Sequence, residues 1–237
     1  MQLKARAILL KTIKYGEKNL ILQTYTRDQG SMSFFIGAHV IRGKNKTLLT
    51  PLSSLDITAS KGKGDLLRIK ELTLINKNYE LISDMHKASV LMFLNEVLLK
   101  TIREYDVDFE LFEFIENSMT ELDQAKNDND FHLKFLLRLS YFLGFYPNGQ
   151  YSDKAPIFDL YEGLFCSEIP GHDLVIMPEH GPLFGKLMEA TFEDDQTLKL
   201  STPERRILLG YLLDYFKIHV EKFDDLKSRE ILEEVLS

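Results

Sequence analysis

The sequence predicts an α+β protein in two parts, a small five-stranded β-barrel over residues 1–79 and an α-helical domain over residues 80–237. Three observations support this division. Short runs of β-forming residues, separated by turns, fill about the first 75 residues, as in an all-β domain. From about residue 80 apolar residues recur at helical spacing instead. Residues 1–80 hold 14 basic and 6 acidic residues, a net charge of +8, whereas the remainder carries −15.

Five runs in the first part are typical of strands. In the first run Ala5, Ala7 and Leu9 alternate against a second set that is also partly apolar. A strand with two usable faces suits a small barrel better than a one-sided sheet. The expected strands are Ala5–Lys14, Leu20–Thr26, Met32–Ile36, Leu52–Ala59 and Leu66–Leu74, with turns at Tyr15–Lys18, Asp28–Gly30 and Lys61–Asp65 and a basic loop over 37–48. Five strands in so short a segment fit a partly open Greek-key barrel of the OB type.

Five helices are expected in the second part. They are Ser83–Glu104, Phe109–Leu122, Phe131–Leu143, a helix from Thr202 to about Glu221, and Lys227–Leu236. In the second helix Leu111, Phe112, Ile115 and Met119 should face inward. Between the third and fourth helices, residues 145–182 are rich in proline and glycine, so this stretch should be irregular and hold at most short strands.

Local residues predict where these helices begin and end. Asp84 or Ser83 can cap the first helix, and the cluster Asn127–Asp130 can cap the third. Gly144 stands where a helix C-terminus commonly takes a left-handed residue. Thr202 is expected as the N-cap of the fourth helix, with Pro203 at its first position.

The composition narrows the class of protein. A hydrophobic fraction of 44% and a charged fraction of 27% are typical of an ordinary globular chain. The first residues lack the long apolar run of a signal peptide. No stretch approaches the roughly 18 uncharged apolar residues that a membrane span needs. Cys166 is the single cysteine, so we expect no intrachain disulfide, no cysteine-built zinc site and a reducing cytoplasmic location.

Motifs for catalysis are not present in usable form. The stretch 38–45 has alanine and asparagine where a phosphate-binding loop needs glycine and Ser or Thr. A mixed metal site from Cys166, His172 and His180 is conceivable, but structural zinc usually takes four ligands in close pairs. Glu193–Asp195 is better explained as a solvated loop. We therefore expect no enzyme, no metal and no cofactor.

The basic residues of the first part favour nucleic acid as a ligand. The predicted DNA-binding set is Lys11, Lys14, Lys18, Arg27, Arg42, Lys44 and Lys46. An OB barrel binds oligonucleotides with a basic groove and aromatic rings on which bases stack. The rings available are Tyr15, Tyr25, Phe34 and Phe35, of which at least half must fill the barrel. The alternative interpretation is a lysine-rich surface that merely keeps the chain soluble.

Four segments together resemble the bacterial RecO family. They are Lys4–Leu22 with Tyr25–Gly30, Pro51-Leu52 after the basic loop, Leu143–Pro147 with its Leu-Gly-aromatic helix end, and Leu226–Leu232, which reads Leu-Lys-Ser-Arg-x-x-Leu. The resemblance spans nearly the whole chain in order. Two other classes stay open: an OB-fold module that binds RNA or serves translation, and an enzyme with its site in residues 145–182.

The resemblance implies a function in DNA repair. It implies binding of single- and double-stranded DNA, annealing of complementary strands, and partnership with RecR and with single-stranded DNA-binding protein. The implied role is to help load the RecA recombinase on protein-coated single strands. Many relatives carry two Cys-x-x-Cys pairs after the Leu-Gly segment, where this chain has only Cys166. We therefore expect apolar packing in place of the metal, by Phe158, Leu160, Leu164, Phe165, Val175 and Ile176.

A partner site is also implied on the third predicted helix. Relatives bind the acidic, Phe-ended tail of single-stranded DNA-binding protein on the helical domain. Aligning the helix by Leu143-Gly144 puts Lys134 and Leu137 near that pocket, and Arg138 lies within the same turn. The alternative is that Leu137 belongs to the core and that the two bases are ordinary solvated side chains.

Overall fold

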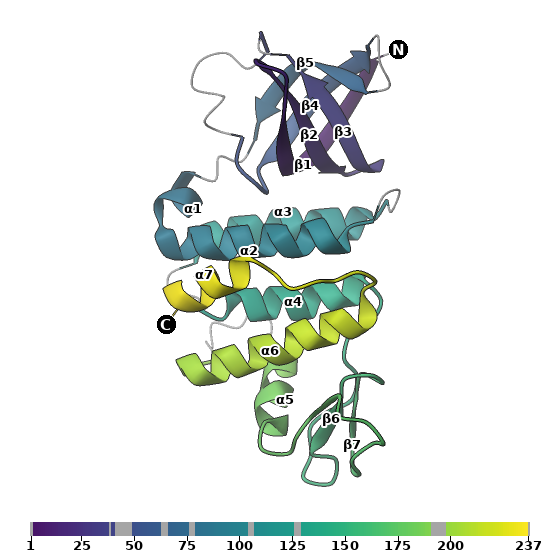
Figure 1. The fold of residues 1–237 in the computed structure, drawn as a ribbon, viewed down its shortest axis with the longest axis vertical. Helices are drawn as coiled ribbons and strands as arrows, with labels where there is room; N and C mark the ends of the chain where they lie inside the picture. The colour runs from purple at the N-terminus through teal and green to yellow at the C-terminus, as the bar shows by residue number, and fades with distance from the viewer. Residues whose placement is uncertain are drawn as a thin grey trace. The chain divides into compact units, whose positions relative to one another are not determined.

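The structure is a computed structural model that describes residues 2–37, 39–40, 49–62, 66–75, 79–103, 107–125, 129–190 and 198–236. It divides into two compact units, unit 1 (Met1–Ala125) and unit 2 (Lys126–Ser237). Unit 1 holds a β-barrel and the first three helices, and unit 2 holds the other helices and a small sheet (Figure 1). The predicted α+β class, with a five-stranded barrel followed by helices, is confirmed.

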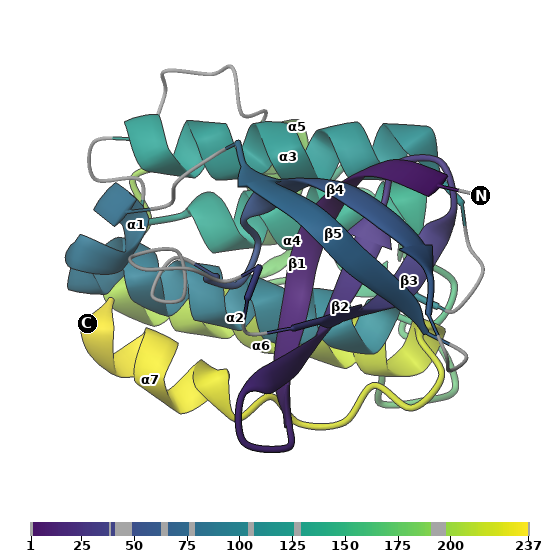
Figure 2. The same ribbon diagram turned by 90° about the horizontal axis from the view of Figure 1, so that it is seen from above.

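The barrel contains the five predicted strands. They are β1 (Gln2–Tyr15), β2 (Asn19–Thr26), β3 (Gly30–Ile36), β4 (Ser54–Lys61) and β5 (Leu67–Leu74). Neighbouring strands follow the order β1-β2-β3-β5-β4, and the barrel is closed rather than partly open. The closure includes a short parallel pairing of β3 with β5, where Phe34 lies opposite Leu67 and Phe35 opposite Arg68. Figure 2 shows the five barrel strands from above.

A bulge in β1 gives this strand two different outer faces. The register against β2 shifts between Leu9 and Lys11. Before the bulge Ala7 and Leu9 point into the barrel core. The opposite residues, Ile8 and Leu10, are buried as well, on the outside of the barrel. Beyond the bulge the outward residues include Lys11, which is exposed. Helices therefore cover the outer face of β1 immediately before the bulge, and the face beyond the bulge meets solvent.

Three helices complete unit 1: α1 (Tyr79–Ser83), α2 (Met85–Thr101) and α3 (Phe109–Gln124). The Asp84 carboxylate accepts hydrogen bonds from the backbone N–H groups of His86 and Lys87, which confirms the predicted cap of α2. Figure 1 shows α2 and α3 at one end of the barrel. The predicted inward residues of α3 are buried: Leu111, Phe112, Ile115 and Met119.

Polar contacts attach α3 to the barrel. The Tyr25 hydroxyl donates to the backbone oxygen of Asp108 and accepts from its N–H, both at 3.1 Å. Arg6 pairs with Glu116, with a nitrogen–oxygen distance of 2.9 Å. The ring of Tyr25 packs against Phe112, with centroids 6.2 Å apart. These contacts fix the start of α3 against the half of the barrel surface that lies before the β1 bulge.

Unit 2 combines four helices with a three-stranded sheet. The helices are α4 (Phe131–Phe142), α5 (Gly181–Glu189), α6 (Thr202–His219) and α7 (Ser228–Val235), and the strands are β6 (Ile157–Asp159), β7 (Leu164–Cys166) and β8 (Val175–Ile176), in the order β7-β6-β8. The prediction of at most short strands in residues 145–182 is confirmed. The sequence patterns did not predict α5, and the apolar packing expected in this region is only partial: Phe158, Leu160 and Ile176 are buried, but Leu164 is 41% exposed.

Two helix caps differ from their predictions. The N-cap of α6 is Ser201, one residue before Thr202, because Ser201 and Glu204 form a reciprocal capping box. Asp130 lies at the start of α4 but makes no capping hydrogen bond there. Its carboxylate instead accepts from the Nε of Arg205 at 2.9 Å. A buried guanidinium is the stronger partner, since it brings a full charge. Asn127 and Asp128 lie outside the described residues.

The end of α4 follows the prediction. Gly144 has a φ of +84°, the left-handed conformation that glycine adopts without strain. Its N–H donates to the backbone oxygen of Tyr141, and the N–H of Phe145 donates to that of Ser140. This pair of hydrogen bonds is the Schellman motif.

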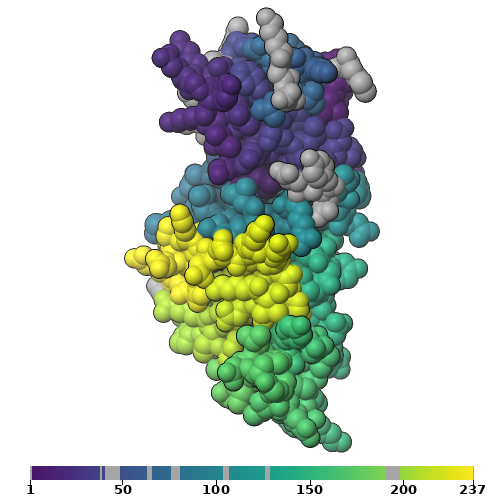
Figure 3. All heavy atoms as spheres, turned by 45° about the vertical axis from the view of Figure 1, so that its right-hand side comes forward, coloured from purple at the N-terminus to yellow at the C-terminus, as the bar shows by residue number. Residues whose placement is uncertain are grey.

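Figure 3 shows the C-terminal part of the chain, in yellow, on the surface of unit 2.

Within the described part of the chain, no helix has both the length and the apolar character to cross a membrane.

Candidate nucleic-acid interface

The predicted DNA-binding residues fall into three groups. Lys11 and Lys14 are on β1, and Lys18 is exposed in the turn that follows. Arg27 follows β2 and is partly buried. The remaining three, Arg42, Lys44 and Lys46, lie outside the described residues.

The lysines of the β1–β2 hairpin do not share one face. Residues that pair across neighbouring strands point to the same side of a sheet. Lys14 pairs with Leu20, a core residue, so it lies on the inward side of the strand near the barrel end. Lys11 has the opposite orientation, because it stands at an odd position of β1 beyond the bulge. Together with Lys18 in the turn, these lysines surround the end of the hairpin.

Arg27 is held by α3. Its guanidinium lies 3.1 Å from a carboxylate oxygen of Glu113 and 4.3 Å from the centre of the Phe109 ring. The positive charge of Arg27 is therefore partly compensated within unit 1. A DNA phosphate at this position has to compete with a carboxylate.

Of the four aromatic candidates only Phe34 lies in the barrel core, fewer than the predicted half, because Tyr25 packs outside the barrel against α3. Tyr25 and Phe34 are fully buried, so they belong to the packing of unit 1. Tyr15 is 57% exposed, and Phe35 is partly exposed on the adjacent outer surface. The two rings meet edge to face, with centroids 5.9 Å apart and an interplanar angle of 86°. This geometry is a favoured one for an aromatic pair.

An arginine that the sequence analysis did not single out joins this pair. Arg68 lies directly opposite Phe35 in the β3–β5 pairing, and its guanidinium is 5.3 Å from the centre of the Phe35 ring. We call Tyr15, Phe35 and Arg68 the aromatic ledge. The alternation of Phe35 with buried Phe34 indicates an outward ring. The pairing of β3 with β5 is long-range, and no local signal marks it.

The outward row that carries the ledge is continuous across four strands. Ile13 pairs with Ile21, Ile21 with Phe35, and Phe35 with Arg68. Ile13 and Ile21 are both partly exposed. The ledge is thus part of an apolar and aromatic strip on the outside of the barrel, bordered by Lys11 and by the lysines of the hairpin end.

The predicted partner residues of α4 are not equally accessible. Lys134 and Leu137 are buried, with 5% and 3% of their surfaces exposed. Arg138 is exposed, and its guanidinium lies 5.2 Å from the centre of the Tyr141 ring. Tyr141 is itself 54% exposed. Arg138 is therefore the member of the set that a partner can reach without rearrangement of α4.

The three residues considered for a metal site each contact a different partner. The Cys166 thiol donates to the backbone oxygen of Glu168, and burial raises its pKa. His172 lies 3.5 Å from the Asp159 carboxylate, and His180 contacts the Tyr211 hydroxyl. In the described ranges, no three His, Cys, Asp or Glu residues are grouped to hold an ion. This donor set does not fit a four-ligand structural zinc site.

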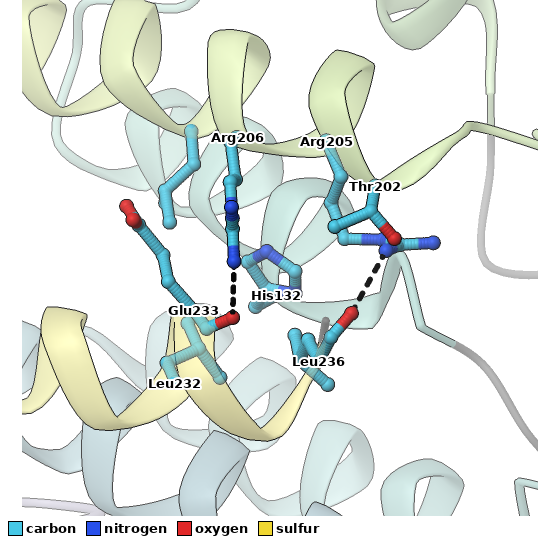
Figure 4. A pocket seen from close by; sticks show the side chains of 8 residues that line it. His132, Thr202, Arg205, Arg206, Leu232, Glu233 and Leu236 are labelled. Atoms are coloured by element: carbon cyan, nitrogen blue, oxygen red, sulfur yellow. Dashed lines mark hydrogen bonds between the residues drawn. The ribbon is translucent and has the colours of Figure 1, made fainter.

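A small pocket in unit 2 is too narrow to be a ligand site. It is lined by residues of α4, α6 and α7, which Figure 4 shows: His132, Thr202, Arg205, Arg206, Leu209, Leu232, Glu233 and Leu236. Its volume is about 10 Å³, which leaves room for one water molecule at most. The two arginines donate to backbone oxygens at the end of the chain, Arg206 to Glu233 and Arg205 to Leu236. These hydrogen bonds fasten α7 to α6.

Comparisons with known proteins cover the whole chain. The family model described as recombination protein O N-terminal matches residues 1–78, and that described as recombination protein O C-terminal matches residues 82–230. Three relatives carry the name DNA repair protein RecO. Those of Flavobacterium psychrophilum and Flavobacterium johnsoniae are 35% and 34% identical over 100% of both chains, and that of Phocaeicola vulgatus is 33% identical over 99% of both chains.

Proposed function

Because the chain belongs to the RecO family of DNA repair proteins, we propose that it binds single- and double-stranded DNA and anneals complementary strands. In this proposal the barrel over residues 1–79 is the DNA-binding domain. The family consists of recombination mediators and not of enzymes, which decides against a catalytic site in residues 145–182. The observation that carries the proposal is the exposed aromatic ledge of the barrel with lysines on its border.

The proposed chemistry of annealing is electrostatic. Two complementary strands repel each other through their phosphates, and lysine and arginine side chains reduce that repulsion without reading the sequence. Lys11, Lys14 and Lys18 surround the end of the β1–β2 hairpin, so a strand can pass there with its bases accessible to a second strand. Arg42, Lys44 and Lys46 belong to the same proposed set. No covalent step is required.

Charge reversal tests the barrel as the DNA site. In the triple variant Lys11→Glu, Lys14→Glu, Lys18→Glu, affinity should fall for single and double strands of any sequence. Each lost phosphate contact should make the negative slope of log K against log salt less steep by about 0.7 for single strands. The slope should therefore become less steep by about 2 if all three contacts are made. A parallel variant reverses Arg42, Lys44 and Lys46.

The matched control changes Lys154, an exposed base of unit 2, to Glu. It should leave both affinity and salt slope close to wild type. If both barrel triple variants bind DNA as wild type does, the barrel is not the DNA site. The rate at which two labelled complementary strands anneal can be monitored by fluorescence energy transfer. This rate should decrease in the same variants that lose affinity.

The proposed partners are RecR and the tail of single-stranded DNA-binding protein, and the proposed role is to help load recombinase on coated single strands. Lys134, Leu137 and Arg138 form the proposed tail site. Because Arg138 is exposed and Lys134 is buried, the test uses Arg138→Glu. We expect a several-fold loss of affinity for an acidic, Phe-ended peptide, through loss of a charge-assisted contact, with naked DNA still bound. Equal peptide affinity in the variant and in a Lys154→Glu control rejects the site.

We also propose that this member of the family works without zinc, in the cytoplasm and associated with the nucleoid. The side chains of Cys166, His172 and His180 are engaged with three different partners, which supports the first point. Elemental analysis of the purified chain should find no stoichiometric zinc. A large fall in melting temperature on adding a chelator would contradict the proposal, since a structural metal contributes folding free energy.

A further inference from the structure

We infer that the aromatic ledge stacks unpaired bases and thereby gives the barrel a preference for single-stranded over double-stranded DNA. This inference rests on the proposed function and adds to it the residues that distinguish the two kinds of strand. The lysines proposed above contact phosphates, which both kinds of strand present. Discrimination requires a group that interacts with the faces of bases, and these faces are free only in a single strand.

The exposure of Tyr15 is the first support. The Tyr15 side chain is 57% exposed, and its edge-to-face contact with Phe35 fixes the orientation of the ring. The ring is therefore both oriented and accessible to a ligand. Immediately before the bulge the outward residues Ile8 and Leu10 are buried beneath the helices of unit 1. Beyond the bulge Tyr15 remains available, because the helices do not extend over the hairpin end. Burying this ring against a base removes apolar surface from water.

The second support is the row of residues behind the rings. Ile13, Ile21, Phe35 and Arg68 are paired in succession across β1, β2, β3 and β5. Three inter-strand spacings of about 4.8 Å make this strip roughly 14 Å long. A partly apolar strip of this length offers several bases a surface to lie on. A duplex cannot use it, because its bases are stacked on one another.

The third support is the position of Arg68. Arg68 is exposed, and its guanidinium lies over the Phe35 ring at 5.3 Å, so its charge stands at the ledge and is accessible from solvent. A planar cation can stack on a base and contact a neighbouring phosphate at the same time.

The test replaces the two rings with another large apolar side chain, in Tyr15→Leu, Phe35→Leu and the double variant. Binding is measured with a fluorescent oligo-thymidine strand and with a duplex of the same length. Loss of base–aromatic stacking should weaken single-strand binding by roughly 5- to 150-fold per ring. Duplex binding should change less than about twofold. The matched control is Tyr141→Leu, because Tyr141 is a similarly exposed tyrosine in unit 2 and also has edge-to-face neighbours.

Salt separates stacking from phosphate contacts. The affinity ratio between wild type and Tyr15→Leu should stay constant as salt rises, because stacking releases no counterions. The ratio between wild type and the Lys11, Lys14, Lys18 triple variant should shrink over the same range. Arg68→Lys keeps the charge and loses the planar group, so it should lose single-strand affinity with little change in salt slope.

The outcomes distinguish this inference from the proposed function. If wild type binds neither probe, the proposed function fails. If wild type binds both and the ring variants lose single strand and duplex equally, or lose neither, DNA binding stands and the ledge is rejected. A variant that unfolds is recognised by circular dichroism. In that case the test is quenching of tyrosine fluorescence by the oligonucleotide. We expect quenching in wild type and less quenching in Tyr15→Phe. If wild type shows no quenching, the ledge is rejected.

Discussion

The buried ion pair between Asp130 and Arg205 should be a main determinant of the stability of unit 2. Their side chains are 6% and 8% exposed, and the Nε–Oδ1 distance is 2.9 Å. Arg205 also donates to the backbone oxygens of Leu236 at 3.3 Å and Leu200 at 3.2 Å. One guanidinium thus joins the start of α4, the residue before the cap of α6 and the end of α7. The informative change is Asp130→Asn, which keeps the shape and removes the charge.

The expected cost follows from the burial of the pair. Removing one partner of a buried ion pair costs about 3–5 kcal/mol, because the other charge stays buried without compensation. The asparagine oxygen can still accept from Nε, so we expect the lower end, about 3 kcal/mol. At 2–4 °C per kcal/mol for a chain of this size, the melting temperature should fall by roughly 6–12 °C.

The control applies the same substitution to an exposed ion pair. Asp225 is 91% exposed and lies 2.7 Å from Lys217. Exposed pairs contribute about 0–1 kcal/mol, so Asp225→Asn should shift the urea midpoint only slightly. Urea unfolding followed by far-UV circular dichroism measures both variants. If Asp130→Asn and Asp225→Asn are indistinguishable, the buried pair does not stabilise unit 2 and the reasoning is refuted.

Three further changes test other contacts. Tyr25→Phe removes the hydroxyl that both donates to and accepts from the backbone of Asp108, and it should lower the unfolding free energy by about 1–3 kcal/mol in urea titration. Burial raises the pKa of Tyr215 to about 12. An unfolded tyrosine loses its proton near 10, so the stability advantage of wild type over Tyr215→Phe should be constant below about pH 9 and shrink as pH rises from 10 to 12. A constant advantage across that window contradicts the assignment. Gly163→Ala should destabilise, because φ is +70° and the added Cβ would lie 2.6 Å from the Tyr215 hydroxyl; Gly171→Ala, which meets nothing within 4 Å, is its control.

Local patterns in the sequence were sufficient to predict most of the secondary structure. Runs of β-forming residues between turns predicted all five barrel strands. Apolar residues at helical spacing, together with capping and helix-ending residues, predicted α2, α3, α4, α6 and α7. The cap at Asp84 and the end of α4 at Gly144 were predicted because each depends on one residue and its near neighbours. Interactions between residues that are close in the sequence can therefore be recognised from the sequence alone.

Features that depend on distant partners could not be predicted. The Asp130 carboxylate could cap α4 or pair with a cation, and the choice depends on Arg205, which lies 75 residues away. The cap at Ser201 is a local exception, because Glu204 three residues later completes a capping-box pattern that the sequence analysis missed. The contact of Arg68 with Phe35 requires the parallel β3–β5 pairing. Long-range choices of this kind depend on tertiary contacts, which outweigh local preference.

The charge of residues 1–80 is distributed more unevenly over the barrel than their total of +8 indicates. Arg6 and Arg27 contribute to that total, yet Glu116 and Glu113 of α3 hold them at 2.9 Å and 3.1 Å. The helix-covered half of the barrel surface is therefore close to neutral at these positions. Lys11, Lys14 and Lys18 lie beyond the bulge of β1, on the half that carries the ledge.

The bulge of β1 separates two roles of one strand. Immediately before it the outward residues are Ile8 and Leu10, which are apolar and buried against the helices of unit 1. After it the outward side carries Lys11, Ile13 and Tyr15 toward solvent. If the same sequence formed a regular strand, strict alternation from Leu9 would turn Lys11 and Tyr15 to the inward side. The register shift at Leu10 is therefore what exposes the ring of the ledge.

Deleting Leu10 tests this account of the bulge. Lys11 would then follow Leu9 directly, and regular alternation would keep Lys11, Ile13 and Tyr15 on the outward side. The deletion should therefore lower the melting temperature, through loss of a buried leucine, and leave single-strand affinity close to that of Leu10→Ala. Leu10→Ala is the matched control, because it removes the same packing and keeps the extra residue. A folded deletion variant that loses single-strand binding, while Leu10→Ala retains it, would contradict the assignment of Leu10 as the extra residue.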